Sequence, residues 1–161
     1  MAIKDSKGFT LIELVLVIGI ISLLAIVVLV AIKPAQRLAD ARDARRAQDL
    51  NQVLTAIHEC AIDKKDTATM TTCLGSLTVN NTYEIVTGNV TSGCQAKCTG
   101  ATSDSSCLPL DTTLQDYFVT LPSDPRGVAA SHSGYSVTLK SNGMTVLEAC
   151  AAESGTIKVS R

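Results

Sequence analysis

Hydrophobic positions form one dense block near the start of the chain and scattered groups after it. From Leu14 to Ile32, about 19 residues follow one another without a charge, and a helix of that length, at 1.5 Å per residue, matches the hydrocarbon core of a bilayer. This pattern predicts a membrane-spanning helix. Lys4 and Lys7 precede the block, and positive charge at the start of an apolar helix favours a cytoplasmic N-terminus.

Two ordinary interpretations of the apolar block fit poorly. A secretory signal peptide has a shorter apolar core followed by a small-residue cleavage site, whereas Lys33-Pro34-Ala35-Gln36 follows here. A plain membrane anchor leaves Glu13 unexplained, because an unpaired carboxylate inside a spanning helix costs about 2.5 to 3.5 kcal/mol. Glu13 is therefore expected to have a charge partner, unless water solvates it at the membrane interface.

The pattern after the block is that of a helix with one apolar face. Hydrophobic residues recur at the i, i+3, i+4, i+7 spacing of such a helix; they are Leu50, Val53, Leu54, Ile57, Cys60 and Ala61. We predict helix from Phe9 to Lys64. Pro34 is expected to kink it, because proline removes a backbone donor and clashes with the preceding turn, and Gly19 is a second weak point.

Charged residues are dense in the first part of this amphipathic segment. They are Arg37, Asp40, Arg42, Asp43, Arg45, Arg46 and Asp49. The spacing of Asp43 with Arg46, and of Arg45 with Asp49, is typical of weak ion pairs on a helix surface. We interpret the stretch as a face that is solvated or paired with a neighbouring subunit, rather than as a nucleic-acid-binding stripe.

The second half of the chain has the alternation of short strands. Residues 135–140 alternate apolar and polar positions, Asn142-Gly143 suits a tight two-residue turn, and residues 144–150 can form the return strand. Shorter strands are predicted at 83–86 and 156–159. A long helix followed by hairpins indicates an α+β fold, in which a small antiparallel sheet covers the apolar face of the helix.

Cysteine usage separates the two parts of the chain. All six cysteines lie outside the apolar block, at Cys60, Cys73, Cys94, Cys98, Cys107 and Cys150. An even number outside a membrane-spanning block indicates disulfides in an oxidising compartment, and 15 pairings remain open. Only one loosely spaced cysteine pair could bind zinc, so we predict no metal site. No cofactor, catalytic constellation or strong nucleic-acid signal is predicted either, since the net charge is −1.

The start of the block carries a specific motif. The residues KGFTLIEL, beginning at Lys7, resemble the cleavage motif of type IV prepilins and type II secretion pseudopilins. The resemblance implies that a prepilin peptidase cuts after Gly8 and N-methylates Phe9, the new N-terminus. The amine at Phe9 lies four residues before Glu13 and could neutralise its carboxylate within one subunit or between subunits. The resemblance thus implies a role for Glu13 in assembly.

The resemblance also implies a domain organisation. The expected parts are a leader (1–8), a transmembrane and filament-core helix (9–34), an amphipathic helix packed on the head (35–65) and a head with disulfide-stapled loops (66–161). Within the head, LPSDPRG at 121–127 resembles the LP-x-DP loop of pseudopilin heads and many pilins. This second match is less specific than the cleavage motif.

The expected function follows from the family resembled. It is a structural, non-enzymatic subunit of a type IV pilus-like filament that serves adhesion, motility, DNA uptake or cell contact. The alternatives are a pseudopilin of a type II secretion system and a minor tip pilin that binds DNA or a surface. Expected partners are further copies in a helical filament, prepilin peptidase, and an inner-membrane assembly platform with its ATPase. The precursor is expected to cross the inner membrane once, and the assembled subunit to lie at the cell surface.

Overall fold

The chain divides into two units, Met1–Leu38 and Ala39–Arg161. The computed structural model describes residues 8–64, 70–75, 77–94, 98, 106–129 and 131–161. Most of the predicted leader, including Lys4 and Lys7, lies outside the described residues.

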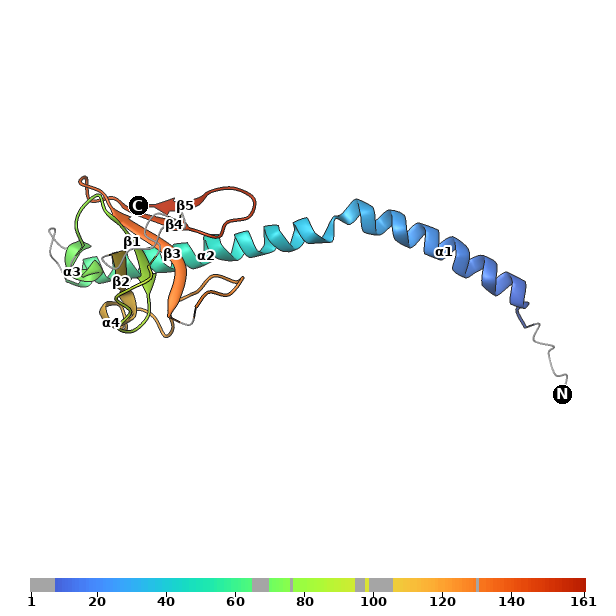
Figure 1. The fold of residues 1–161 in the computed structure, drawn as a ribbon, viewed down its shortest axis with the longest axis horizontal. Helices are drawn as coiled ribbons and strands as arrows, with labels where there is room; N and C mark the ends of the chain where they lie inside the picture. Colours follow the sequence, from blue (N-terminus) through green and yellow to red (C-terminus); the bar gives the residue numbers. More distant parts are fainter. Residues whose placement is uncertain (1–7, 65–69, 76, 95–97, 99–105, 130) are drawn as a thin grey trace. The chain divides into compact units, whose positions relative to one another are not determined.

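The first unit contains helix α1, Leu11–Ile32 (Figure 1). Its side chains are apolar almost throughout, and none of them is buried. By length and composition, the helix beginning at Leu11 could cross a membrane, and it alone meets that test among the residues described.

One residue interrupts the helical backbone between Leu11 and Asp63. Lys33 adopts the left-handed conformation, with φ 47° and ψ 65°, and helix α2, Pro34–Asp63, starts at the next residue. The break is expected at this point, because proline disfavours the right-handed α conformation in the residue before it and is well suited to the first position of a helix. Proline favours an extended conformation there, so the left-handed conformation of Lys33 differs from the usual one. Gly19 lies inside the uninterrupted α1. A kink of the helix axis at Pro34 or at Gly19 stays a prediction.

The second unit is an α+β head built on most of α2. Short helices and strands follow in the order α3 (Met70–Leu74), β1 (Thr82–Val86), β2 (Cys107–Pro109), α4 (Leu110–Thr113), β3 (His132–Leu139), β4 (Thr145–Ala149) and β5 (Ile157–Ser160). The strands form one five-stranded sheet in the order β2-β1-β3-β4-β5, and this sheet lies along α2 (Figure 1). The predicted α+β architecture is thus confirmed.

Two details of the sheet differ from the prediction. The pairing of β1 with β2 is parallel, whereas the other three pairings are antiparallel. The β3–β4 hairpin does not turn on two residues with positive φ: only Gly143 has one, at 81°, and its N–H donates to the carbonyl of Lys140 at 2.9 Å. A turn closed by one left-handed glycine gives a slightly longer connection than the tight turn that Asn-Gly favours.

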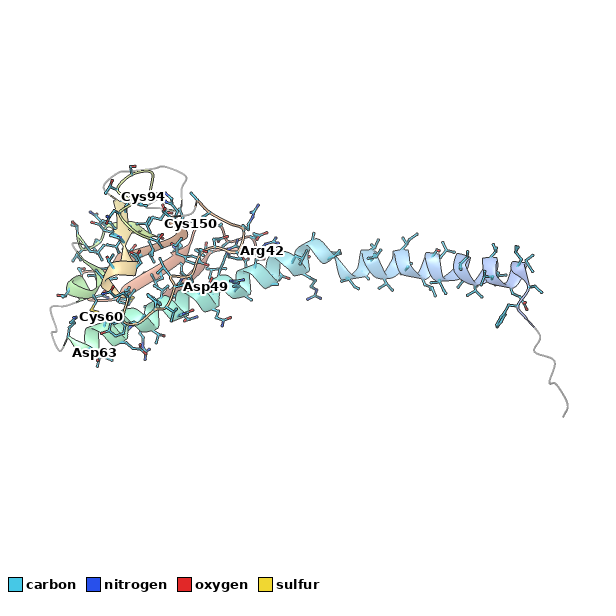
Figure 2. The ribbon with its side chains drawn as sticks, turned by 90° about the horizontal axis from the view of Figure 1, so that it is seen from below. Arg42, Asp49, Cys60, Asp63, Cys94 and Cys150 are labelled. Carbon is cyan, nitrogen blue, oxygen red and sulfur yellow. A yellow bond between two sulfur atoms is a disulfide. The ribbon has the colours of Figure 1, made fainter. Side chains whose placement is uncertain are left out.

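The core lies between α2 and the sheet. The predicted apolar face of α2 is buried from Leu50 to Cys60 and packs against Tyr135, Val137 and Leu147 of the sheet. In Figure 2, Asp49 and Cys60 mark the ends of this buried part of the helix.

Disulfides tie the loops of the head to its helix and sheet. The pairs are Cys60–Cys73, Cys94–Cys107 and Cys98–Cys150, so every cysteine is oxidised. The first links the end of α2 to α3, and the second links the segment after β1 to β2. The third joins residues 52 positions apart. The structure therefore selects one of the pairings that the sequence left open.

Candidate functional site

The predicted processing site lies in exposed chain at the start of α1. Gly8 and Phe9 precede the helix, and the Phe9 side chain is 91% exposed. The residues on either side of the bond that a peptidase would cut are thus both exposed.

Glu13 forms a reciprocal cap with Thr10 at the first turn of α1. The backbone N–H and the hydroxyl of Thr10 each donate to Glu13 Oε2 at 2.8 Å, and the N–H of Glu13 donates to Thr10 Oγ1 at 3.3 Å. This arrangement is a capping box, which satisfies helix N–H groups that have no partner in the helix itself. The negative charge of Glu13 also stabilises the helix, because it lies near the positive end of the helix dipole.

Thr10 was not singled out by the sequence analysis, although its signal was present. Thr10-Leu11-Ile12-Glu13 is the T-x-x-E pattern of a capping box that precedes an apolar run. The cap gives Glu13 a hydrogen-bonded partner before any cleavage takes place. The pairing of Glu13 with the amine of Phe9 stays a prediction, because that amine exists only after the leader has been removed.

Behind the cap, α1 offers a long apolar surface. Phe9, Leu11 and Ile12 are each at least 74% exposed, and large apolar side chains remain more than half exposed at most positions up to Val30. A monomeric soluble protein rarely exposes a contiguous apolar surface of this extent. A surface of this kind is suited to lipid or to packing against further helices.

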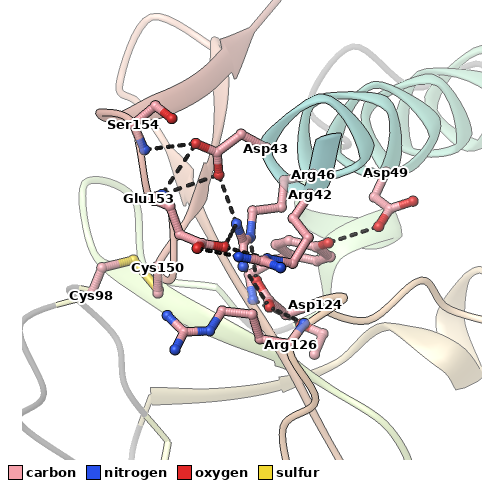
Figure 3. Close-up of polar contacts among 12 residues, drawn as sticks. Arg42, Asp43, Arg46, Asp49, Cys98, Asp124, Arg126, Cys150, Glu153 and Ser154 are labelled. Carbon is pink, nitrogen blue, oxygen red and sulfur yellow. Dashed lines mark hydrogen bonds and ion pairs between the residues drawn. A yellow bond between two sulfur atoms is a disulfide. The ribbon is translucent and has the colours of Figure 1, made fainter. Parts of the chain in front are cut away.

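A second polar site lies inside the head, where a solvated face was predicted. The Arg46 side chain has no exposed surface. Its Nε and Nη2 atoms donate to the two carboxylate oxygens of Asp124 at 2.7 and 2.9 Å, and Nη1 donates to Asp43 at 2.6 Å and to Glu153 at 3.1 Å. With Arg42, which forms a two-fold contact to Glu153, these residues form the Arg46 cluster (Figure 3).

The prediction of a solvated or inter-subunit face is wrong for three of the charged residues, whereas Arg37, Asp40 and Arg45 are exposed. Asp43, Arg46 and Asp49 are buried, because loops from the far end of the chain bring charged partners to the helix. The expected pair of Asp43 with Arg46 is present. No ion pair joins Arg45 to Asp49 in the described structure; Asp49 instead accepts a hydrogen bond from the Tyr135 hydroxyl at 2.7 Å.

The cluster shifts the proton affinity of its carboxyl groups. Burial alone would raise the pKa of Asp43, but the N–H groups of Glu153 and Ser154 and the Arg46 guanidinium lower it to about 2. The guanidinium of Arg42, against the opposing effect of burial, lowers the pKa of Glu153 to about 2. Burial would also raise the pKa of Asp124, yet the hydrogen bonds from Arg46 leave it lowered overall. All three groups are charged at neutral pH.

A possible metal-binding group occurs elsewhere in the head. Ligand atoms of Glu84, Cys94 and His132 lie within 4.8 Å of one another. Cys94, however, is bonded to Cys107, and a disulfide sulfur is not the thiolate that metal ions bind. His132 Nδ1 lies 3.1 Å from Glu84 Oε1, so these two residues form a pair without any ion.

Comparison with models of protein families gives a match in the N-terminal region. Residues 3–29 match the model described as the prokaryotic N-terminal methylation motif. Searches of curated proteins and of solved structures return no significant match. The matched segment includes Gly8, Phe9, the Thr10–Glu13 cap and most of the exposed apolar helix. This chain therefore carries the prepilin motif of type IV pilin-like and pseudopilin proteins, a structural family made as membrane-anchored precursors.

Proposed function

We propose that the protein is a structural subunit of a type IV pilus-like filament, assembled by packing of its N-terminal helices. The observation that carries this proposal is the exposed apolar surface of α1, with a capped glutamate at its first turn. In the precursor the bilayer covers this surface, and in the filament the helices of other subunits cover it. Both environments are apolar, so the helix can move from one to the other without losing its hydrophobic stabilisation.

Glu13 would set the register of this packing. Removal of the leader after Gly8 creates a cationic amine at Phe9, and a carboxylate in an apolar bundle is stable only when it is paired. We propose that the amine of one subunit binds Glu13 of its neighbour and replaces part of the local cap from Thr10. A subunit placed out of register would leave both charges unpaired in the filament core.

The proposed partners and location follow from this route. Prepilin peptidase would trim and N-methylate the chain, and an inner-membrane assembly platform with its ATPase would extract it into the filament. The precursor would cross the inner membrane with a cytoplasmic N-terminus, consistent with the lysines before the block. The head would then be displayed outside the cell, where its three disulfides are stable.

A second candidate is a pseudopilin of a type II secretion system. The LP-x-DP-like loop at 121–127 favours it, and in this structure Asp124 of that loop anchors the Arg46 cluster. Because the same loop type also occurs in many pilins, the contact does not separate the two functions. The densely disulfide-bonded head suits a surface fibre better than a short periplasmic filament.

The test compares sheared surface material from native cells with cells that carry Glu13→Ala or Glu13→Gln. We expect thin fibres from the wild type, with an intact mass that begins at methylated Phe9, and no fibres from either variant. Asp116→Ala is the matched control, because Asp116 is an exposed carboxylate of the head; it should leave the fibres intact.

Other outcomes separate the alternatives. Mature wild-type chain in the membrane fraction without any surface fibre would contradict the pilus proposal and favour the pseudopilin. A mass that retains residues 1–8 would contradict processing. Fibres of normal abundance from Glu13→Gln would show that the charge of Glu13 is not needed for assembly.

A further inference from the structure

The apolar contacts of α2 with the rest of the head begin at Leu50 and continue toward the C-terminus of the helix. On the N-terminal side of Leu50, the buried residues of α2 are Asp43, Arg46 and Asp49, all charged. The helix between its entry into the head at Ala39 and Leu50 is therefore held by polar contacts, whereas the helix after Leu50 is held by the apolar core.

Two separate segments supply the partners of this charged stretch. The loop at 121–127 brings Asp124, whose carboxylate also accepts the backbone N–H of Arg126 at 2.9 Å. The connection from β4 to β5 brings Glu153 and Ser154, whose backbone N–H groups donate to Asp43 at distances of 2.7 to 3.2 Å. Figure 3 shows Arg46 between these two segments, with Cys150 and its disulfide at the start of the second.

Opposite charges from three segments meet in this region. Arg42, Arg46 and Arg126 face Asp43, Asp124 and Glu153, from α2, the 121–127 loop and the β4–β5 connection. The remaining titratable groups nearby are Asp40, which accepts from the Ser154 hydroxyl at 3.2 Å, and Asp49 with Tyr135 of β3. The contacts of Arg46 with Asp43, Asp124 and Glu153 hold one geometry, because breaking one of them weakens the pairing of a guanidinium that has no exposed surface.

We propose that the Arg46 cluster is a clasp that sets how much of α2 belongs to the head. When the cluster is closed, residues 40–49 are fixed against the 121–127 loop and the β4–β5 connection. When it is open, the head begins at Leu50, and ten residues of helix, about 15 Å, are released from it. This inference goes beyond the filament proposal and does not depend on it, since it concerns the isolated subunit.

The sign of the pH dependence distinguishes this clasp from ordinary packing. The pKa values of Asp43 and Glu153 lie near 2 in the folded head, against about 4 when unfolded. Their contribution is therefore complete above about pH 4 and is lost as the pH falls toward 2. Without the Arg46 guanidinium, Asp124 would lose the hydrogen bonds that chiefly lower its pKa while staying buried, so its ionised form would destabilise the closed cluster. Asp43 would keep the N–H donors of Glu153 and Ser154.

The experiment measures amide hydrogen exchange of the full mature chain in detergent micelles at pH 7 and about pH 3.5, with correction for intrinsic exchange. We expect Arg46→Met to lower the protection of residues 40–49 by about a hundredfold at pH 7, and by less at the lower pH. Protection around Val53 to Ile57 should stay as in the wild type. Arg45→Met is the matched control, since Arg45 is exposed and has no ion pair in the described structure; it should change nothing.

Two results would overturn the proposal. One is unchanged protection of residues 40–49 in Arg46→Met, and the other is an equal loss across the whole head. Should Arg46→Met fail to fold, Glu153→Gln replaces it, because this change weakens the contacts of the β4–β5 connection to Arg42 and Arg46 only. Loss of protection confined to residues 40–49 and 150–156 would then support the clasp, and a uniform or absent loss would contradict it.

Discussion

Tyr135 and Asp49 show how a single polar contact is placed inside the core. The tyrosine is fully buried, and its hydroxyl donates to Asp49 Oδ2 at 2.7 Å. Burial raises the pKa of Tyr135, and the hydrogen bond to Asp49 raises it further. The hydroxyl is therefore protonated at neutral pH and can act as a donor.

Replacing Tyr135 with phenylalanine tests this contact. The change keeps the ring but leaves the buried Asp49 carboxylate without its donor, and we expect a loss of about 1 to 3 kcal/mol in the free energy of unfolding. Urea denaturation followed by circular dichroism measures it. Tyr117→Phe is the control, because the Tyr117 hydroxyl donates to Asp63 in an exposed position; an equal loss in both variants would contradict a special role for burial.

Sequence reasoning at the residue scale succeeded where the partner was close in the chain. The pair of Asp43 with Arg46 could be predicted from its helical spacing, and the cap of Thr10 on Glu13 was readable in the same way. The burial of Arg46 could not be predicted, because Asp124 and Glu153 lie 78 and 107 residues further along the chain. Only the folded loops bring these carboxylates to the helix.

At the scale of elements, the junction between α1 and α2 depends on two adjacent residues. Lys33 has a positive φ of 47°, a conformation that costs a non-glycine residue about 1 kcal/mol or more. Pro34 accounts for the loss of the right-handed helical conformation at Lys33, since proline disfavours that conformation in the residue before it.

Pro34→Ala should therefore join the two helices. We expect Lys33 to become helical once the proline ring is removed, and its Cα chemical shift in micelles to move to the helical range. Ala35→Gly serves as a control, because it alters the next residue but keeps the proline, and it should leave Lys33 in its original conformation. A Lys33 that stays left-handed in Pro34→Ala would show that something other than the proline holds it.

The other elements differ in how plainly the sequence encodes them. The strands β3 and β4 have clear alternation and were predicted, and β5 was expected from the residues after the Ser154-Gly155 turn. The strand β2 and the helix α4 span only Cys107–Pro109 and Leu110–Thr113. Segments of three or four residues are too short for a period to appear, and the parallel position of β2 beside β1 depends on long-range packing.

At the scale of the whole molecule, the head depends on covalent links as well as on its core. Its aromatic content is low, at 3% of the chain, and three disulfides connect its loops to α2, β2 and the end of β4. A cross-link stabilises a fold mainly by restricting the unfolded chain, with a larger effect for a longer loop.

Removing the Cys98–Cys150 disulfide, by Cys98→Ser with Cys150→Ser, should lower the free energy of unfolding by about 2 to 5 kcal/mol. Removing Cys60–Cys73 in the same manner should cost less, because its residues are 13 positions apart rather than 52. Thermal unfolding monitored by circular dichroism compares the two. The reverse order would contradict loop closure as the dominant effect.

The same long disulfide also affects how the head would respond to proteolysis. Arg126 is exposed, and a cut after it would separate Cys98 from Cys150 in sequence but not in the molecule, since their bond still joins the two fragments. The pairing of β1 with β3 lies across the same cut and would hold the fragments in place. A chain cut once at this loop would thus remain one covalently linked molecule, and the cut would not release the C-terminal strands.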